Sequence, residues 1–221
     1  MATDGHGLQI KAEITELQKE SLLAEIIQQK DDPEASANIT VALGLLKKRD
    51  RLEFALEKLT ELGVYRMILF QGDHSERGHA RLDRLEGIIQ SALKQSLGSW
   101  LPKLNIVDSL EDIFGLEGMD SVEEIYLADE TLETQSLAGE MHEDETPETQ
   151  TPRKRDVTES IAYTLLPHRL LLIGPEGGFS KRERDWLASH HPECRALSLG
   201  KRRLRAETAA IAGLLSLQQG S

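Results

Sequence analysis

The chain has 221 residues, 39% of them hydrophobic, which suits one substantial domain with a small appendage. It has no apolar run long enough to span a bilayer and no hydrophobic signal-peptide region, and its single cysteine, Cys194, excludes an internal disulfide. We therefore expect a cytoplasmic protein without a membrane partner. The net charge of −12 argues mildly against nucleic acid as a partner, although the distribution of charge matters more than its total.

The first 37 residues are predicted to form a small β segment. Residues 8–14 and 21–27 have the composition of short strands, and residues 30–38 have the composition of a linker. We place a domain boundary near Asn38, which divides the chain into 1–37 and 38–221. A segment of this size is usually too small for a stable core, so we expect it to pack on the rest.

After Asn38, apolar strands alternate with amphipathic helices. The predicted strands are 38–45, 64–70, 103–107, 123–129 and 168–174. The predicted helices are 49–63, with Leu52, Ala55, Leu56, Leu59 and Leu62 facing inward, and 80–96, with Leu82, Leu85, Ile88, Ile89 and Leu93 facing inward. This pattern predicts an α/β fold with a mostly parallel sheet covered on both faces. The polar residues 139–156 are predicted to be a flexible acidic insertion.

The stretch "GPEGGF", residues 174–179, follows the strand 168–174 and precedes a helix. Ser180 and Glu183 have the spacing of a capping box at the start of that helix. Ligands of open α/β sheets bind at the carboxyl ends of strands, and the glycines permit close approach of the backbone. The stretch matches neither a Walker-type phosphate loop nor the dinucleotide fingerprint. By itself it is as consistent with an ordinary glycine-rich turn as with a binding loop.

A second glycine-bearing loop joins the predicted last strand, 194–199, to a helix that begins near Glu207. Of three basic clusters, 47–51, 152–155 and 201–205, any one is usually a solvated face. The third is unusual because it places its cations just before a helix N-terminus, against the helix dipole. A site that receives an anionic polymer would explain that placement.

These two segments carry a family resemblance. "LIGPEGGFS…E" followed by "SLGxRxLRxETA" resembles the 16S ribosomal RNA (uracil-N3)-methyltransferase family of the SPOUT (trefoil-knot) superfamily. "DRLEFALEKLTELGV", "HSER" and "SALKQSLGSWLPKL" extend the resemblance over residues 38–221. Residues 4–27 resemble the last part of the family's N-terminal PUA-like barrel, without its earlier strands. The chain departs from the family pattern at Lys94, Ser99 and Ala206.

The resemblance implies a deep C-terminal trefoil knot preceded by a truncated PUA-like β segment. It implies S-adenosyl-L-methionine as cofactor, small-subunit ribosomal RNA as partner and a homodimer. The cofactor-binding positions that it implies are Leu127, Ala128, Leu172, Ile173, Gly174, Pro175, Glu176, Gly177, Gly178, Leu199, Gly200, Arg203, Leu204 and Arg205.

The resemblance also suggests which residues handle the RNA. Methyl transfer to the uracil N3 requires loss of a weakly acidic proton, so developing negative charge must be stabilised. Arg205 is the candidate for this role. Glu207 is the candidate for orienting Arg205 or assisting the proton, and it could equally be a helix-start acid. Candidate RNA contacts are Arg77, Gln95, Lys201 and Arg202. The histidine and cysteine spacings suggest no metal site.

Other functions stay open at this point. A methyltransferase of this superfamily could act on a different RNA, such as transfer RNA. A knotted protein without catalysis could bind RNA or assist ribosome assembly. A nucleotide-binding enzyme is disfavoured, because the GPEGG loop lacks the lysine and hydroxyl that phosphate loops use.

Overall fold

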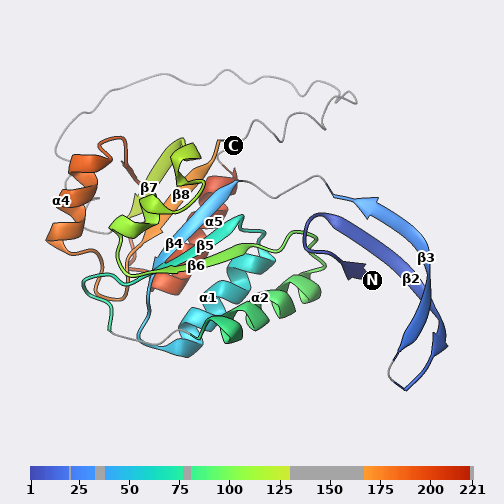
Figure 1. Ribbon diagram of the computed structural model, residues 1–221. Coiled ribbons are helices and arrows are strands. Elements are labelled where there is room, and N and C mark those ends of the chain that lie inside the picture. Colours follow the sequence, from blue (N-terminus) through green and yellow to red (C-terminus); the bar gives the residue numbers. More distant parts are fainter. Residues whose placement is uncertain (20, 33–37, 77–80, 130–166, 220–221) are drawn as a thin grey trace.

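The computed structural model describes residues 1–19, 21–32, 38–76, 81–129 and 167–219, and Figure 1 shows their arrangement. Residues 139–156, predicted to be an insertion, lie outside this part of the chain. Arg77, one of the candidate RNA contacts, does so too. Among the described residues, no helix combines the length and the apolar character needed to cross a membrane.

The N-terminal segment is an antiparallel sheet of β1 (Ala2–Thr3), β2 (Leu8–Leu17) and β3 (Leu22–Asp31). The β2 and β3 strands are longer than predicted, because their pairing continues through the hairpin end and as far as Asp31. In Figure 1 this ribbon extends away from the α/β body. The boundary predicted near Asn38 falls between this sheet and the next one, and it remains a prediction as a division between domains.

The N-terminal sheet attaches to the body at Ser99 and Trp100. The Gly7 N–H donates to the Ser99 carbonyl at 3.0 Å, and the Trp100 indole N–H donates to the Asp32 carbonyl at 2.8 Å. The Ser99 hydroxyl donates to the Asp32 carboxylate at 2.9 Å. Ser99 therefore docks the ribbon on the body through its carbonyl and its hydroxyl.

The main sheet is parallel, with six strands in the order β6-β5-β4-β8-β7-β9. Its strands are β4 (Ile39–Gly44), β5 (Arg66–Phe70), β6 (Lys103–Val107), β7 (Glu124–Ala128), β8 (Arg169–Ile173) and β9 (Arg195–Ala196). The predicted α/β fold is thus confirmed. The last strand is shorter than the predicted 194–199, because the chain leaves the sheet edge after the Leu197 N–H donates to the Leu127 carbonyl.

Helices and short 3₁₀ turns cover both faces of this sheet (Figure 1). The helices are α1 (Arg49–Glu61), α2 (Leu82–Ser96), α4 (Lys181–His190) and α5 (Ala206–Gln219), and the turns are η1 (Glu111–Gly115) and η2 (Met119–Ser121). Side chains of α1, α2 and α5 form one hydrophobic cluster with the sheet, and those of η1, η2 and α4 form the other. Helix α5 contacts α1, β4 and β8, so the C-terminal segment returns from the sheet edge to its centre.

Most of the helix residues predicted to face inward do so. Two exceptions lie at helix ends, and a third, Ile88 in the interior of α2, is half-buried against the core. Leu62 is the C-cap of α1 and is partly exposed, whereas Leu82, the first residue of α2, is 43% exposed. Thr60 is buried in place of an apolar residue, and its hydroxyl donates to the Leu56 carbonyl at 2.7 Å. The periodic pattern therefore predicts most of the buried positions, and of the residues predicted to face inward only Leu82 is exposed.

Candidate active site

A cavity of about 690 Å³ lies at the carboxyl ends of β7 and β8, beside the start of α5. Its wall contains most of the predicted cofactor positions, namely Ala128, Ile173, Gly174, Pro175, Glu176, Gly177, Gly178, Leu199, Gly200, Arg203, Leu204 and Arg205. The predicted RNA contacts Lys201 and Arg202 line the same cavity. The structure therefore brings the two glycine-bearing loops, 174–179 and 197–205, around one space.

Four predicted residues in the described part of the chain do not line this cavity, namely Leu127, Leu172, Gln95 and Glu207. Leu127 and Leu172 are 4% and 0% exposed and belong to the hydrophobic cluster on the α4 side of the sheet. They point away because side chains alternate along a strand, and Ala128 and Ile173 take the cavity side. Gln95 is exposed on α2, outside the cavity.

The 174–179 loop is held by contacts on two sides. The Gly178 N–H donates to the Pro175 carbonyl at 2.8 Å, and Gly178 has φ +69°, a conformation that favours glycine. Both carboxylate oxygens of Glu176 accept from the Lys47 backbone N–H at 3.2 Å. On the other side, His74 Nδ1 lies 3.0 Å from the Gly177 carbonyl oxygen. Glu176 thus fixes the loop to the start of α1 and is already engaged before any ligand binds.

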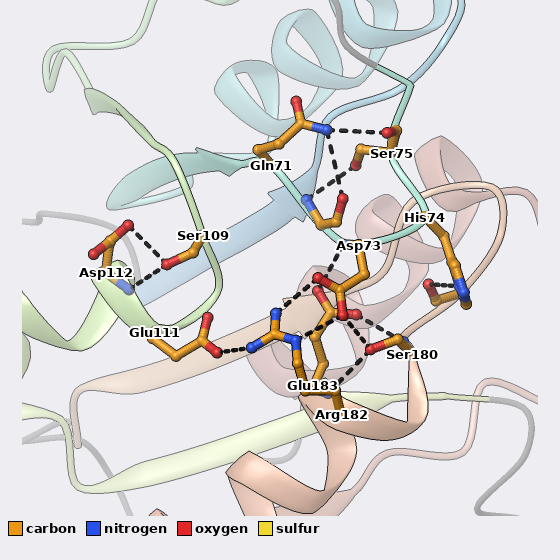
Figure 2. Close-up of polar contacts among 12 residues, drawn as sticks. Gln71, Asp73, His74, Ser75, Ser109, Glu111, Asp112, Ser180, Arg182 and Glu183 are labelled. Carbon is orange, nitrogen blue, oxygen red and sulfur yellow. Dashed lines mark hydrogen bonds and ion pairs between the residues drawn. The ribbon is translucent and has the colours of Figure 1, made fainter.

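Figure 2 shows a polar cluster that ties the loop after β5 to the start of α4. The Asp73 carboxylate accepts from Arg182 Nε at 2.9 Å, from Arg182 Nη2 at 2.7 Å and from the Ser180 hydroxyl at 2.5 Å. Arg182 also pairs with Glu111. Hydrogen bonds from Arg182 and Ser180 lower the pKa of Asp73 from 3.8 to about 2. The carboxylate is therefore ionised at neutral pH and holds the two segments together.

The capping box predicted at α4 is present and takes part in the same cluster. The Ser180 hydroxyl accepts from the Glu183 N–H at 3.1 Å, and Glu183 Oε2 accepts from the Ser180 N–H at 2.7 Å. Glu183 is fully buried, and its Oε1 accepts from the Asp73 N–H at 3.1 Å. One glutamate therefore both caps the helix and anchors the 72–76 loop beside the cavity (Figure 2).

The 197–205 loop presents exposed cations at the cavity. Lys201, Arg202 and Arg205 are exposed, and within the described ranges no carboxylate forms an ion pair or hydrogen bond with any of them. Their charges stand before the N-terminus of α5, where the helix dipole is unfavourable to them. The local excess of positive charge is available to an anionic ligand despite the acidic total.

Glu207 differs from the expectation. It is 6% exposed and does not line the cavity, because as the second residue of α5 it faces α1. Its Oε1 lies 3.7 Å from Arg51 Nε, and its Oε2 is buried without a hydrogen-bond partner. Arg51 does line the cavity. Arg51 was not among the predicted site residues, because a basic cluster such as 47–51 usually lies on a solvated face.

Other cavity residues were also absent from the predicted set: Asp129, Phe179, Arg184, Leu197, Ala206 and Ala209. Arg184 Nη1 donates to the Phe179 carbonyl at 2.6 Å and to Asp129 Oδ2 at 3.3 Å. Arg184 lies one turn beyond Ser180 on α4, a spacing that could have indicated it. Within the described residues, no three histidine, cysteine or carboxylate side chains gather as a metal site would require.

Similarity to known proteins identifies the family of this chain. A family model described as "RNA methyltransferase domain" matches residues 33–218. The chain belongs to this RNA methyltransferase family. It is 26% identical over 216 residues to Ribosomal RNA small subunit methyltransferase E of Rickettsia conorii, covering 98% of this chain and 77% of the relative. The Bacillus subtilis protein of the same name is 26% identical over 220 residues, covering 96% and 77%.

Solved structures agree with this assignment. A probable rRNA-methyltransferase from Porphyromonas gingivalis has a TM-score of 0.72 and 28% identity, covering 98% of this RNA methyltransferase and 82% of the other chain. Ribosomal RNA small subunit methyltransferase E from Neisseria gonorrhoeae, bound to S-adenosyl methionine, has a TM-score of 0.73 and 25% identity, covering 98% and 81%. The SPOUT-like α/β fold implied by the sequence motifs is thereby confirmed.

Proposed function

We propose that this RNA methyltransferase transfers a methyl group from S-adenosylmethionine to N3 of a specific uridine in small-subunit ribosomal RNA. The observation that carries the proposal is the cavity between the two glycine-bearing loops, whose wall includes the exposed cations Lys201, Arg202 and Arg205. The relatives named above, which modify small-subunit ribosomal RNA by their names, support this substrate. The structure bound to S-adenosyl methionine supports the cofactor.

The cavity fits such a cofactor in size and in chemistry. Its volume, about 690 Å³, lies within the range of roughly 300–1,000 Å³ that is usual for ligand pockets. Among the described residues, the backbone N–H and C=O groups of Leu199 and Leu204 make no hydrogen bond within the protein. Free backbone donors and acceptors can read the edge of an adenine. Bound S-adenosylmethionine would supply an electrophilic methyl group at its sulfonium.

The chain's own residues would then handle the RNA. Arg205 lines the cavity and stands next to α5, so its guanidinium can stabilise negative charge that develops on the uracil oxygens as N3 loses its proton. Lys201 and Arg202 can neutralise neighbouring phosphates. Gln95 remains a candidate contact at a distance from the cavity.

Glu207 takes a different role from that of a base. Because it is buried and faces Arg51, we assign it the positioning of Arg51 at the cavity wall. The Glu207→Gln variant should weaken cofactor binding or methyl transfer by less than the Arg51→Ala variant, since it keeps the shape and removes the charge. If Glu207→Gln instead changed the pH dependence of methyl transfer, that result would indicate a proton-transfer role for Glu207.

We also propose that the enzyme is a homodimer through α5. This helix carries small residues, and Leu215 on its outer side is 37% exposed. Light scattering should give twice the mass of one chain, and Leu215→Lys should give monomers. A wild-type protein that remains monomeric at high concentration would contradict this proposal.

The function is tested in two steps. Calorimetric titration of S-adenosylmethionine should give saturable binding at one site per chain. Transfer of a labelled methyl group is then measured with purified small-subunit rRNA and with the assembled subunit, followed by digestion and mass spectrometry for N3-methyluridine. Arg205→Ala should reduce transfer by about a hundredfold or more.

The matched control is Arg195→Ala, which removes an exposed arginine outside the cavity. It should leave transfer within about twofold, as expected for a surface substitution. Failure of the folded wild-type protein to bind the cofactor would refute the proposed chemistry. A methyl group found on transfer RNA, or on another atom of the base, would refute the proposed substrate while leaving the family assignment intact.

A further inference from the structure

A second cavity, of about 670 Å³, lies at the amino ends of the parallel strands, at the edge of the sheet opposite the first cavity. Residues that line it include Asn38, Tyr65, Arg66, Gln90, Lys103 and His168. The two cavities share no lining residue. A ligand in the second cavity would therefore be separate from the cofactor site.

Arg66 is the unusual residue of this cavity. It is only 7% exposed, yet its hydrogen-bond partners are neutral: its Nε donates to Asn105 Oδ1 at 2.8 Å and its Nη1 donates to the Glu117 carbonyl at 2.7 Å. Within the described residues, no carboxylate lies within 4 Å of its guanidinium and nothing accepts from its Nη2. Of the five N–H donors of an arginine, three thus remain unused.

The free donors of Arg66 reach the cavity. Among the described residues, the fully buried side-chain atoms that lack a hydrogen-bond partner belong to Glu111 and Glu207. Arg66 Nη2 also lacks a partner but is not one of these atoms, so it keeps some solvent-accessible surface. A buried charge without a counter-ion is costly. Burial lowers the pKa of Arg66, but a guanidinium stays protonated in proteins. The cavity therefore has a permanent positive charge in its wall.

The charged neighbours of Arg66 are mixed: the Glu117 carboxylate acts on Arg66 through space and lines the cavity together with Glu86, whereas Lys103 adds a second cation. The other neighbours suggest what else the ligand carries. His168 is buried, with its ring nitrogens 2.9 Å from the Thr40 hydroxyl and 3.0 Å from the Ser121 hydroxyl. Burial first, and then Arg66, lower the pKa of His168, so it adds no charge at neutral pH. Tyr65 is 40% exposed and packs edge-on against His168, which leaves part of its ring open to an aromatic partner.

We propose that this second cavity binds a nucleotide, with its phosphate on Arg66 and its base against Tyr65. A planar guanidinium with adjacent free N–H groups suits a phosphate oxygen pair. Bases stack on aromatic rings, and the side-chain amides of Asn38 and Gln90 can hydrogen-bond a base edge. The nucleotide comes either from the cell's free nucleoside monophosphates or from an RNA chain, and the experiment distinguishes these sources.

The test is a titration of the full-length chain with uridine 5′-monophosphate, adenosine 5′-monophosphate, uridine and a short single-stranded RNA. The readouts are calorimetry and the NMR signal of the Arg66 Nε–H group. We expect saturable binding of the monophosphates or of the RNA, a shift of the Arg66 signal, and at least tenfold weaker binding of uridine. Binding of both would identify free nucleotides as sufficient, and binding of RNA alone would identify the RNA chain as the source.

Variants complete the test. Arg66→Gln should weaken binding at least tenfold, and Arg66→Lys should weaken it less. If substitution of the buried arginine disturbs folding, the rim variant Tyr65→Ala gives a second test. Tyr65→Ala should weaken nucleotide binding, and inorganic phosphate should still compete with the nucleotide as strongly as it does in the wild type. The matched control Arg205→Ala, in the first cavity, should leave the shift of the Arg66 signal unchanged.

Several results would overturn the proposal. These are no saturable binding to the folded wild-type chain, binding without a change in the Arg66 signal, or complete competition by S-adenosylmethionine. Cofactor binding and methyl transfer are measured at the first cavity. A negative result at the second cavity would therefore not contradict the proposed function.

Discussion

The Asp73 carboxylate holds the 72–76 loop against α4, and its replacement tests whether charge carries that contact. In Asp73→Asn, the bonds from Arg182 at 2.7 and 2.9 Å lose their ionic character while the side chain keeps its size. The pKa of Asp73 falls from 3.8 to about 2, which at about 1.4 kcal/mol per tenfold change in proton affinity is equivalent to about 2.5 kcal/mol. Because the side chain is 34% exposed, solvent screening reduces this to about 1 kcal/mol.

The sign of the pH dependence follows from the lowered pKa. The folded protein binds the Asp73 proton more weakly than the unfolded chain, so this stabilisation is fully present above pH 3.8 and is lost as the pH falls toward 2. We expect Asp73→Asn to lower the free energy of unfolding by about 1 kcal/mol at pH 7. The gap between wild type and variant should narrow as the pH is lowered from 5 to 3.

Urea denaturation followed by circular dichroism, repeated at pH 7, 5, 4 and 3, measures that gap. Asp185→Asn is the matched control, because its ion pair with Lys181 joins side chains that are 63% and 84% exposed. It should change stability within error at every pH. A gap for Asp73→Asn that is equally large at pH 5 and pH 3 would show that the contact does not depend on the carboxylate charge, and the reasoning would be wrong.

Other predictions concern packing and titration. Gly213→Ala should destabilise the protein by roughly 1–3 kcal/mol in urea denaturation, since the new Cβ would lie 2.7 Å from Leu171 Cδ2. Gly87→Ala, whose new Cβ would have no atom within 4 Å, should stabilise the protein by about 0.5–1 kcal/mol. Equal effects of the two substitutions would contradict the packing argument. In an NMR titration, His168 should show a pKa below its ordinary value of 6.5, because the neutral ring is buried. Its contribution to stability is therefore present above pH 6.5 and is lost as the pH falls. A pKa above 6.5 would show that the ring is not buried in its neutral form. Burial raises the pKa of the Cys194 thiol from 9.0 to about 11, so the native protein should react with a thiol reagent about a hundredfold more slowly than the unfolded chain, and equal rates would contradict this.

Local sequence determined the features that depend on neighbouring residues. The capping box of Ser180 and Glu183 was predictable because its hydrogen bonds join residues three apart. The buried faces of α1 and α2 were predictable because helical periodicity fixes which side chains share a side. The two site loops were predictable as motifs, and the family resemblance joined them into one expected site.

The tertiary structure decided what depends on contacts between distant segments. Glu207 had a helix-start position typical of exposed acids, and packing of α5 on α1 buried it beside Arg51. Leu127 and Leu172 lay in the right segments, but strand alternation turned them toward the core. No periodicity or motif marks Arg66 as a buried cation beside a cavity, because that placement requires Asn105 and Glu117, about 40 and 50 residues away along the chain, to supply neutral partners. Burial and charge pairing are properties of the assembled fold, so they become visible only after the chain has folded.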